Sequence, residues 1–446
     1  METKFVEKEL PEYRVPTRVP MIGADIYGTR FEKLEAIRKK QGYDCFLIYA
    51  DREHCANMLW LTGFDPRFEE ALWVQGLSRT PALIVGNECY AFALDQIKLD
   101  ARVLLYQQFS LQDQPRSTSN DLLTLLAKTG LAHGMRVGMI GWKSMRECDA
   151  PFWIVAAVQE VTGSVPENVT GLVTDPPDGL RLQLEPEMIL FCEYAACISS
   201  DAVKAWVLNM HEGVSERDSA RHLHSYGLEL SVHPMVNFGA RIPSGLKSPR
   251  NAVARRGEYA QCAFGVIGAL TCRAGRLADR RTPDADGYLE LVENYLQVVR
   301  SWYAALEVGA IAGGVVHAAV SAKNAGWEFA LNPGHLLHLD EWVASPFAVD
   351  SKVPLRSGYA IQQDIIPVPT DSPAVANIED GLILADKDLQ QRLQRLDPLF
   401  FVRCMARRDF MRFLGYRVSE EVLPLSNIAG IFFPFLLEPK VVVSFR

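Results

Sequence analysis

The sequence has no apolar run long enough to cross a membrane. Its longest apolar stretch, residues 428–437, contains Pro434 and has about half the length of a transmembrane helix. The N-terminal residues are charged where a secretion signal would have an apolar core. We therefore expect no membrane association and no cleaved targeting segment, and we predict a cytoplasmic protein.

The sequence also lacks an excess of basic residues and a zinc-type cysteine pattern. It has 46 Lys and Arg against 54 Asp and Glu, so its formal net charge is −8. A dedicated nucleic-acid binder needs a concentrated basic face, so we expect no nucleic-acid partner. The nine cysteines are scattered and odd in number, which is typical of reduced thiols in a cytosol. Small molecules or proteins are the expected partners.

What the sequence does have is enough chain for two domains, because 446 residues exceed what one hydrophobic core normally serves. In the first part, apolar patterns predict helices at 30–40 and 122–131, and strands at 45–49, 82–85, 89–93 and 136–140. A turn-rich stretch at 173–181 marks the predicted boundary. We therefore predict an α/β N-terminal domain over residues 1–178.

The second part mixes long helical patterns with strands, without regular alternation. Helices are predicted at 187–208, 216–227 and 288–306, and strands at 235–239, 259–270 and 360–367. This pattern favours an α+β domain over residues 179–385. Residues 386–446 are predicted to form a C-terminal extension that packs on the second domain, with a basic amphipathic helix at 400–413.

Local strings then point to one family. In the first domain they are residues 30–39, 44–49 and 57–64, and in the second 256–258, 262–265, 333–335, 355–358 and 377–380. In order and approximate spacing they resemble the family of creatinase, prolidase and aminopeptidase P, over roughly residues 25–385. The resemblance implies a pita-bread fold for the α+β domain, a hydrolase, and a homodimer.

The resemblance also implies a set of metal ligands. The metallopeptidases of this family hold two metals with two aspartates, one histidine and two glutamates. The histidine position matches His335, and the two glutamate positions match Asp364 and Glu379. The aspartate positions read Ala263 and Ala274, and two neighbouring cations need several carboxylates to offset their repulsion. We therefore expect no dinuclear metal site.

Creatinase, which works without metal, is the other guide within the family. Its acid–base histidine aligns with Lys247, and a lysine acts as a base only where burial or nearby cations lower its pKa. Its glutamate after the second strand position aligns with Arg276. The second histidine of the peptidases, which contacts substrate, falls near Trp342. Creatine and ordinary dipeptides are therefore doubtful substrates.

Strand alternation puts Cys272, Ala274 and Arg276 on one face of the sheet. Arg276 is suited to binding a carboxylate through two hydrogen bonds, and Arg241, Lys247 and Arg250 would add positive charge. We therefore expect a small anionic, amino-acid-like substrate. His338 and Arg67 are further candidate substrate contacts, the latter because family members send this loop into the neighbouring subunit's site.

Three functions stay open at this point. The first is a metal-independent, creatinase-like hydrolase of a C–N bond without a cofactor, in which His335 is acid or base and Asp364 or Glu379 orients it. Its nucleophile is water or Cys272. The second is an Xaa-Pro peptidase-like enzyme with a single Zn, Mn or Fe on His335, Asp364 and Glu379. The third is an inactive homologue with a binding role.

Overall fold

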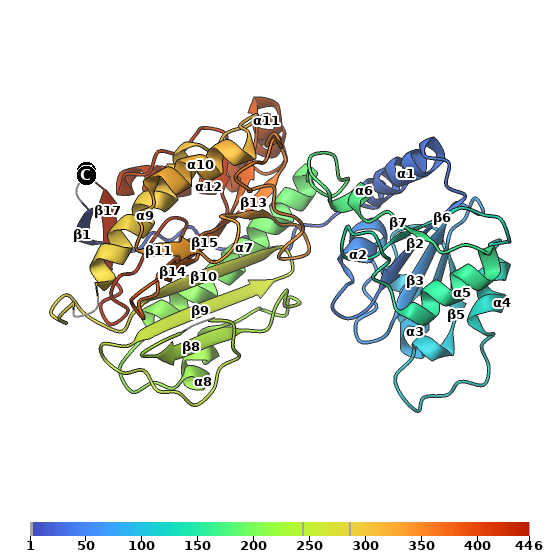
Figure 1. Cartoon of the computed structure of the whole chain (residues 1–446), viewed down its shortest axis with the longest axis horizontal. Coiled ribbons are helices and arrows are strands. Elements are labelled where there is room, and N and C mark those ends of the chain that lie inside the picture. Colours follow the sequence, from blue (N-terminus) through green and yellow to red (C-terminus); the bar gives the residue numbers. More distant parts are fainter. Residues whose placement is uncertain (1–2, 243–244, 285–286, 446) are drawn as a thin grey trace. The chain divides into compact units, whose positions relative to one another are not determined.

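The computed structural model describes residues 3–242, 245–284 and 287–445 and divides the chain into two compact units (Figure 1). One unit is residues 22–181, and the other joins the residues up to Met21 with those from Leu182 onward. The boundary therefore lies after Arg181 rather than after residue 178. The N-terminal segment belongs to the second unit because β1 (Thr3–Glu7) pairs with β17 (Val441–Phe445).

Residues 22–181 form an α/β unit around a six-stranded mixed sheet. Its elements are α1 (Ala24–Lys40), β2 (Cys45–Ala50), α2 (Ala56–Thr62), β3 (Ala71–Gln75), β4 (Ala82–Val85), α3 (Asn87–Gln96), β5 (Arg102–Leu105), η1 (Gln107–Phe109), α4 (Leu122–Thr129), β6 (Val137–Ile140), α5 (Phe152–Thr162), β7 (Glu167–Asn168) and α6 (Gly171–Thr174). The strand order is β5-β4-β3-β2-β6-β7. Leu47 and Val74 on one face pack with α4 and α5 in a common core, and Phe31 of α1 contacts Trp73 on the other face.

One element of this unit differs from the sequence prediction, because residues 89–93 lie in helix α3 rather than in a strand. Cys89 and Ala93, four residues apart, are its buried positions and so lie on one helix face. The carboxylate of Glu69 accepts hydrogen bonds from the backbone N–H groups of Glu88 (3.3 Å) and Cys89 (2.9 Å). This cap comes from a residue distant in sequence, which an apolar pattern cannot reveal.

The second unit is built on a seven-stranded sheet in which every pairing is antiparallel. Its further elements are α7 (Pro186–Leu208), α8 (Glu216–Ser219), η2 (Ala220–His222), β8 (Met235–Gly239), β9 (Tyr259–Val266), β10 (Ala269–Arg276), α9 (Tyr288–Ala304), α10 (Ala312–Ala322), β11 (Trp327–Phe329), β12 (His335–Leu336), β13 (Ala360–Asp364), β14 (Pro367–Pro369), β15 (Asn377–Leu384), α11 (Lys387–Leu396), α12 (Pro398–Leu414) and β16 (Val422–Pro424). The order is β12-β13-β15-β10-β9-β8, and β16 also pairs with β15. Helix α7 packs against β9 and β10.

Two turns shorten elements that the sequence predicted as continuous. The predicted strand at 259–270 is the hairpin of β9 and β10, whose turn contains Gly268 at a φ of 99°. The predicted helix at 216–227 ends at His222, and Tyr226 and Gly227 have φ values of 52° and 86°. Left-handed residues cannot continue a right-handed helix, so the chain turns here.

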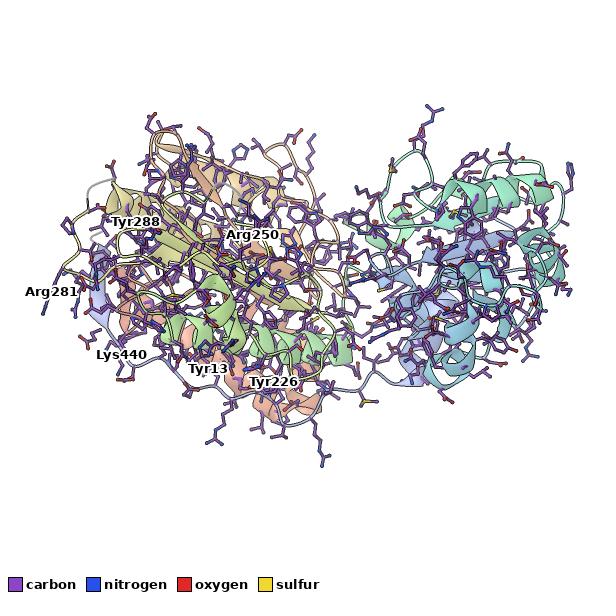
Figure 2. All side chains as sticks on the ribbon, turned by 90° about the horizontal axis from the view of Figure 1, so that it is seen from below. Tyr13, Tyr226, Arg250, Arg281, Tyr288 and Lys440 are labelled. Atoms are coloured by element: carbon purple, nitrogen blue, oxygen red, sulfur yellow. The ribbon has the colours of Figure 1, made fainter. Side chains whose placement is uncertain are left out.

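The ends of the chain are integral parts of the second unit. In the N-terminal segment, the Tyr13 hydroxyl donates to the Ala406 carbonyl (3.4 Å), and the Arg407 guanidinium lies 5.6 Å from the centre of the Tyr13 ring (Tyr13 is labelled in Figure 2). The segment from residue 386 onward supplies α11, α12 and the sheet strand β16. No helix among the described residues is both long and apolar enough to cross a membrane.

Candidate metal centre

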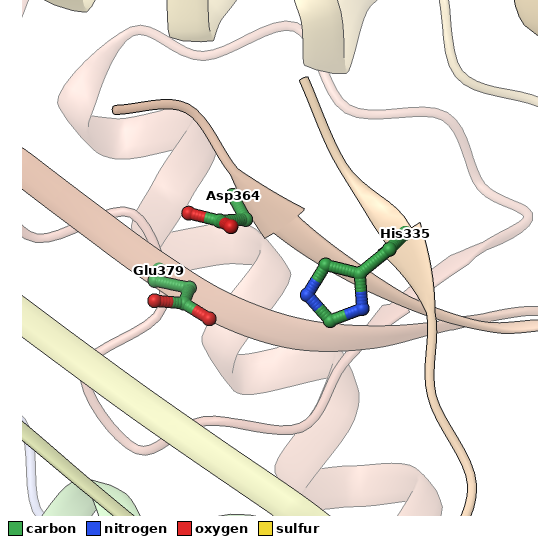
Figure 3. Close-up of side chains that lie close together, drawn as sticks. All are labelled: His335, Asp364 and Glu379. Atoms are coloured by element: carbon green, nitrogen blue, oxygen red, sulfur yellow. The ribbon is translucent and has the colours of Figure 1, made fainter. Parts of the chain in front are cut away.

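Strand register brings the candidate residues to one face of the second sheet. Asp364 on β13 lies opposite Glu379 on β15, and Glu379 lies opposite Cys272 on β10. Residues directly opposed in antiparallel strands project to the same face. His335 on β12 lies opposite Gln362, two residues before Asp364 on the same strand. Figure 3 shows the imidazole ring pointing toward the two carboxylates.

His335, Asp364 and Glu379 form a compact buried group. One ligand atom from each lies within 4.8 Å of the other two. All three side chains are buried, and the Oδ1 atom of Asp364 has no hydrogen-bond partner among the described residues. An unpartnered buried carboxylate oxygen is costly, and a bound cation would satisfy it. One imidazole and two carboxylates are ligands that Zn, Mn and Fe accept, so the residues present fit one metal ion.

The imidazole of His335 is held from three sides. Its Nδ1 atom lies 3.4 Å from the Leu336 carbonyl oxygen, and its Nε2 atom lies 3.2 Å from Oε1 of Glu341. The Trp342 ring stacks on the imidazole, with 4.2 Å between ring centroids and 19° between planes. Protein contacts therefore hold the ring in one orientation.

Neighbouring side chains position the strands and Glu379. The Gln362 amide donates to Oε1 of Glu379 (3.2 Å) and to the Leu270 carbonyl (2.7 Å), which links β13 to β10. On the opposite face, Arg273 of β10 makes a buried ion pair with Asp380 of β15 (2.8 Å). Asp380 therefore has a structural partner of its own, and Glu379 is the member of the pair that faces the site.

Burial disfavours the charged form of the two carboxyl groups and so raises their pKa values. Burial raises the pKa of Asp364 to about 7, against an opposing effect of His335. Burial, and then the charge of Asp364, raise the pKa of Glu379 well above its ordinary value. Burial by itself would lower the pKa of His335, but the hydrogen bond and charge of Glu341 outweigh it, and the pKa is raised. The group without a cation therefore holds protons that a metal would displace.

The structure brings together the three predicted ligands and Trp342, and it adds two residues that the sequence prediction missed. Glu341 and Gln362 lie beside them, each within hydrogen-bonding distance of a candidate ligand. Gln362 could have been identified from the strand register, because it lies directly opposite His335. No pattern in the sequence marks Glu341, because the loop conformation after β12 brings it back to the imidazole.

Two predicted site residues do not have the surroundings that their predicted roles require. The Arg276 guanidinium donates to the Gly257 and Pro283 carbonyls (3.3 and 3.0 Å) and pairs with Asp284 (3.3 Å), so it is engaged by the protein itself. A substrate carboxylate would have to compete with these contacts, and the predicted clamp by Arg276 stays a prediction. The side chain of Lys247 is exposed, so the burial that a lysine base needs is missing.

Cys272 lies beside the group but has the wrong character for a nucleophile. Its Sγ accepts hydrogen bonds from the side-chain amides of Asn377 (3.3 Å) and Gln261 (3.6 Å). Burial, and then the charge of Glu379, raise the pKa of the thiol well above its ordinary value. A neutral buried thiol is a poor nucleophile, so the geometry disfavours that alternative.

The remaining predicted contacts are less informative. His338 is buried, three residues after His335 on the same segment. Arg67 is exposed in the other unit, with a φ of 60° and an ion pair to Asp65 (3.7 Å). Its predicted contact with a neighbouring subunit stays a prediction.

Comparison with solved structures identifies the architecture. The Xaa-Pro dipeptidase from Bacillus anthracis superposes with a TM-score of 0.63 over 81% of this chain and 96% of that chain, at 16% identity. The X-Pro aminopeptidase from Thermotoga maritima MSB8 gives 0.63 over 80% and 95%, at 15% identity. The recombinant prolidase from Thermococcus sibiricus gives 0.66 over 81% and 95%, at 17% identity.

The chain has the two-domain prolidase fold. This confirms the predicted α/β N-terminal domain and pita-bread C-terminal domain. No protein-family model matches the sequence, and a search of curated proteins finds no match. At these identities the similarity to prolidases and aminopeptidases P describes the fold, so the chemistry must be argued from the site itself.

Proposed function

We propose that this protein is a hydrolase of an amide C–N bond in a small peptide-like substrate, and that it uses one divalent cation held by His335, Asp364 and Glu379. The observation that carries the proposal is the buried group of three donors within 4.8 Å, one oxygen of which has no partner among the described residues. The substrate class comes from the names of the solved structures with this fold, which are Xaa-Pro dipeptidases, prolidases and aminopeptidases.

The residues of the chain have separate tasks in this proposal. A bound divalent cation supplies Lewis-acid chemistry at a carbonyl oxygen and lowers the pKa of a water molecule. The Trp342 ring and the Leu336 carbonyl fix the orientation of His335, and Gln362 holds the Glu379 carboxylate toward the group. Groups that contact metal ligands in this way set the orientation and basicity of those ligands.

The number of carboxylates on this face of the sheet supports one cation rather than two. Beside Glu379 the sheet continues with Cys272, Ala263 and Met235, which form a small apolar cluster with Leu270. None of these side chains is a carboxylate, and two cations a few ångströms apart need several. We therefore propose a mononuclear site. The small size of the substrate, expected from the sequence, is part of the same proposal. Its anionic character and a homodimer also remain proposals.

A metal-free hydrolase is the second candidate, and the pairing of His335 with Glu341 at 3.2 Å is the observation that favours it. A carboxylate beside an imidazole stabilises the imidazolium, which would let His335 act as a general acid. This candidate predicts turnover in the complete absence of metal. We rank it second because it leaves the unpartnered oxygen of Asp364 without a role.

The test begins with the metal content of the protein. We would purify the wild type, His335→Ala, and His317→Ala as an exposed histidine control, and quantify Mn, Fe, Zn and Co per chain. The proposal expects close to one metal per chain in the wild type and the control, and none in His335→Ala.

Activity against Xaa-Pro and other dipeptides, before and after chelation, then distinguishes the candidates. Chelator-sensitive turnover supports the metal-dependent enzyme. Turnover without metal supports the second candidate. Neither metal nor turnover would contradict both and return attention to a binding role.

A further inference from the structure

A third acidic side chain reaches the metal group from the loop after β12. Oε1 of Glu341 lies 3.2 Å from Nε2 of His335, and the Glu341 side chain is 24% exposed, whereas that of His335 is 0% exposed. Glu341 is therefore more accessible than Asp364 and Glu379, which are 5% and 6% exposed. The three ligands suggested by sequence resemblance do not include it.

The distance between Glu341 and His335 is that expected of two ligands on one cation. Metal bonds to imidazole nitrogen and carboxylate oxygen are about 2.0–2.2 Å long. Two such ligands at tetrahedral or octahedral angles are then about 2.8–3.6 Å apart. The observed 3.2 Å lies within this range, so the separation of these two atoms is compatible with binding to one cation.

The contact is better suited to a cation than to a hydrogen bond. Nδ1 of His335 faces the Leu336 carbonyl at 3.4 Å, a placement in which Nδ1 carries the hydrogen and Nε2 offers a lone pair. Nε2 has no well-aligned hydrogen-bond partner among the described residues, although Oε1 of Glu341 is near. Two electron-rich atoms at this distance need a positive charge between them, which is a proton without metal or a metal ion that displaces it. A metal ion imposes no linear N–H···O alignment.

A second buried atom without a partner also indicates a bound cation. Oδ1 of Asp364, in a side chain that is 5% exposed, also has no partner among the described residues. Figure 3 shows Asp364, Glu379 and the His335 ring converging from three strands. The unsatisfied atoms of His335 and Asp364 thus lie on one group, as expected of ligands that share an ion.

We propose that Glu341 is a fourth ligand of the cation, so that the site consists of one imidazole and three carboxylates. This inference rests on the proposed metal-dependent function. Three carboxylates with one imidazole form a harder and more anionic set than the three ligands alone, which favours Mn²⁺ or Fe²⁺ over softer ions. Because Glu341 is partly exposed, it is also the ligand most able to detach when a substrate oxygen binds.

The experiment measures Mn²⁺ affinity by isothermal titration calorimetry on chelator-treated full-length protein at neutral pH. The variants are Glu341→Gln, which removes the charge, Glu341→Asp, which keeps it on a shorter side chain, and His335→Ala. Glu307→Gln is the control, since it makes the same change at an exposed position. Circular dichroism confirms that each variant is folded, and the visible spectrum of bound Co²⁺ reports on the ligand set independently of activity.

We expect Glu341→Gln to weaken Mn²⁺ binding by about 10-fold or more, Glu341→Asp to weaken it less, and both to change the Co²⁺ spectrum. Glu307→Gln should match the wild type. Unchanged or tighter Mn²⁺ binding in Glu341→Gln, with binding abolished in His335→Ala, would overturn the role of Glu341 and leave the proposed function standing. Failure of the wild type to bind any metal would overturn both.

Discussion

Strands β12, β13 and β15 and strands β8, β9 and β10 belong to one sheet, yet they present different chemistry on the same face. The first three carry His335, Asp364 and Glu379, with Glu341 nearby. On the last three, Met235, Ala263 and Cys272 form an apolar cluster next to Glu379, and the neutral amides of Gln261 and Asn237 lie beyond it. The carboxylates of the polar half, on β12, β13 and β15, must be neutralised by protons or by a cation. The apolar half, on β8, β9 and β10, has no carboxylate on this face that needs neutralising. The boundary between Glu379 and Cys272 therefore limits the charge that the site can hold.

The strongest way to break this contrast is to give the apolar half the carboxylates that it lacks. We expect the double variant Ala263→Asp, Ala274→Asp to bind about two Mn²⁺ per chain instead of one, because both residues share the face of Glu379. Without metal it should lose about 3 kcal/mol of stability, since new buried carboxyls have no partner.

Elemental analysis and urea denaturation measure these two effects. The control is Ala263→Asn, Ala274→Asn, which adds similar volume without charge and should still bind a single ion. A folded aspartate variant that binds only one Mn²⁺ would show that side chains other than these two limit the site.

A smaller expected effect concerns the polar half, and it is the dependence of folding stability on pH. The pKa of Asp364 is raised to about 7 in the folded protein, whereas an unfolded aspartate titrates near about 4. Between these values the folded state binds the extra proton, so stability is full at the acidic end and is lost as pH rises through about 7. The maximum slope from this one group is about 1.4 kcal/mol per pH unit. Glu379 should extend the loss to higher pH.

Urea denaturation of chelator-treated protein across this pH range provides the measurement. Asp364→Asn removes the titrating group and should flatten the slope, while Asp350→Asn, at an exposed position, should not. Added Mn²⁺ should stabilise the wild type most at high pH, because the ion displaces protons. Stability that rises from acidic to neutral pH, with no change in Asp364→Asn, would mean that Asp364 does not carry the expected proton.

The sequence predicted the fold, and it singled out the three residues that the structure brings together, for a physical reason. Pita-bread strands are marked by local strings, and the turn before His335 and an acidic residue in each of two apolar strands are visible without a structure. An acidic residue within an apolar strand is costly unless it has a partner, so Asp364 stood out.

The partners themselves were harder to predict. Arg276 was expected to face a substrate, but Asp284, eight residues away in a loop, pairs with it. Lys247 aligned with a catalytic base, but its loop leaves it exposed. Glu341 reaches His335 only through the path of the chain after β12. These contacts depend on loop conformation and long-range packing, which apolar periodicity does not encode.

The smallest expected effect lies at the boundary itself. Cys272→Ala removes a buried sulfur next to Glu379 and should cost about 1 kcal/mol of stability, leaving metal content and turnover unchanged. Cys262→Ala is the matched control, because Cys262 is buried on β9 opposite Arg273 and so faces away from the site. Urea denaturation, metal content and turnover are compared for both. If only Cys272→Ala lost turnover while retaining its metal, the thiol would be a participant in catalysis, and the apolar half would contribute chemistry as well as shape.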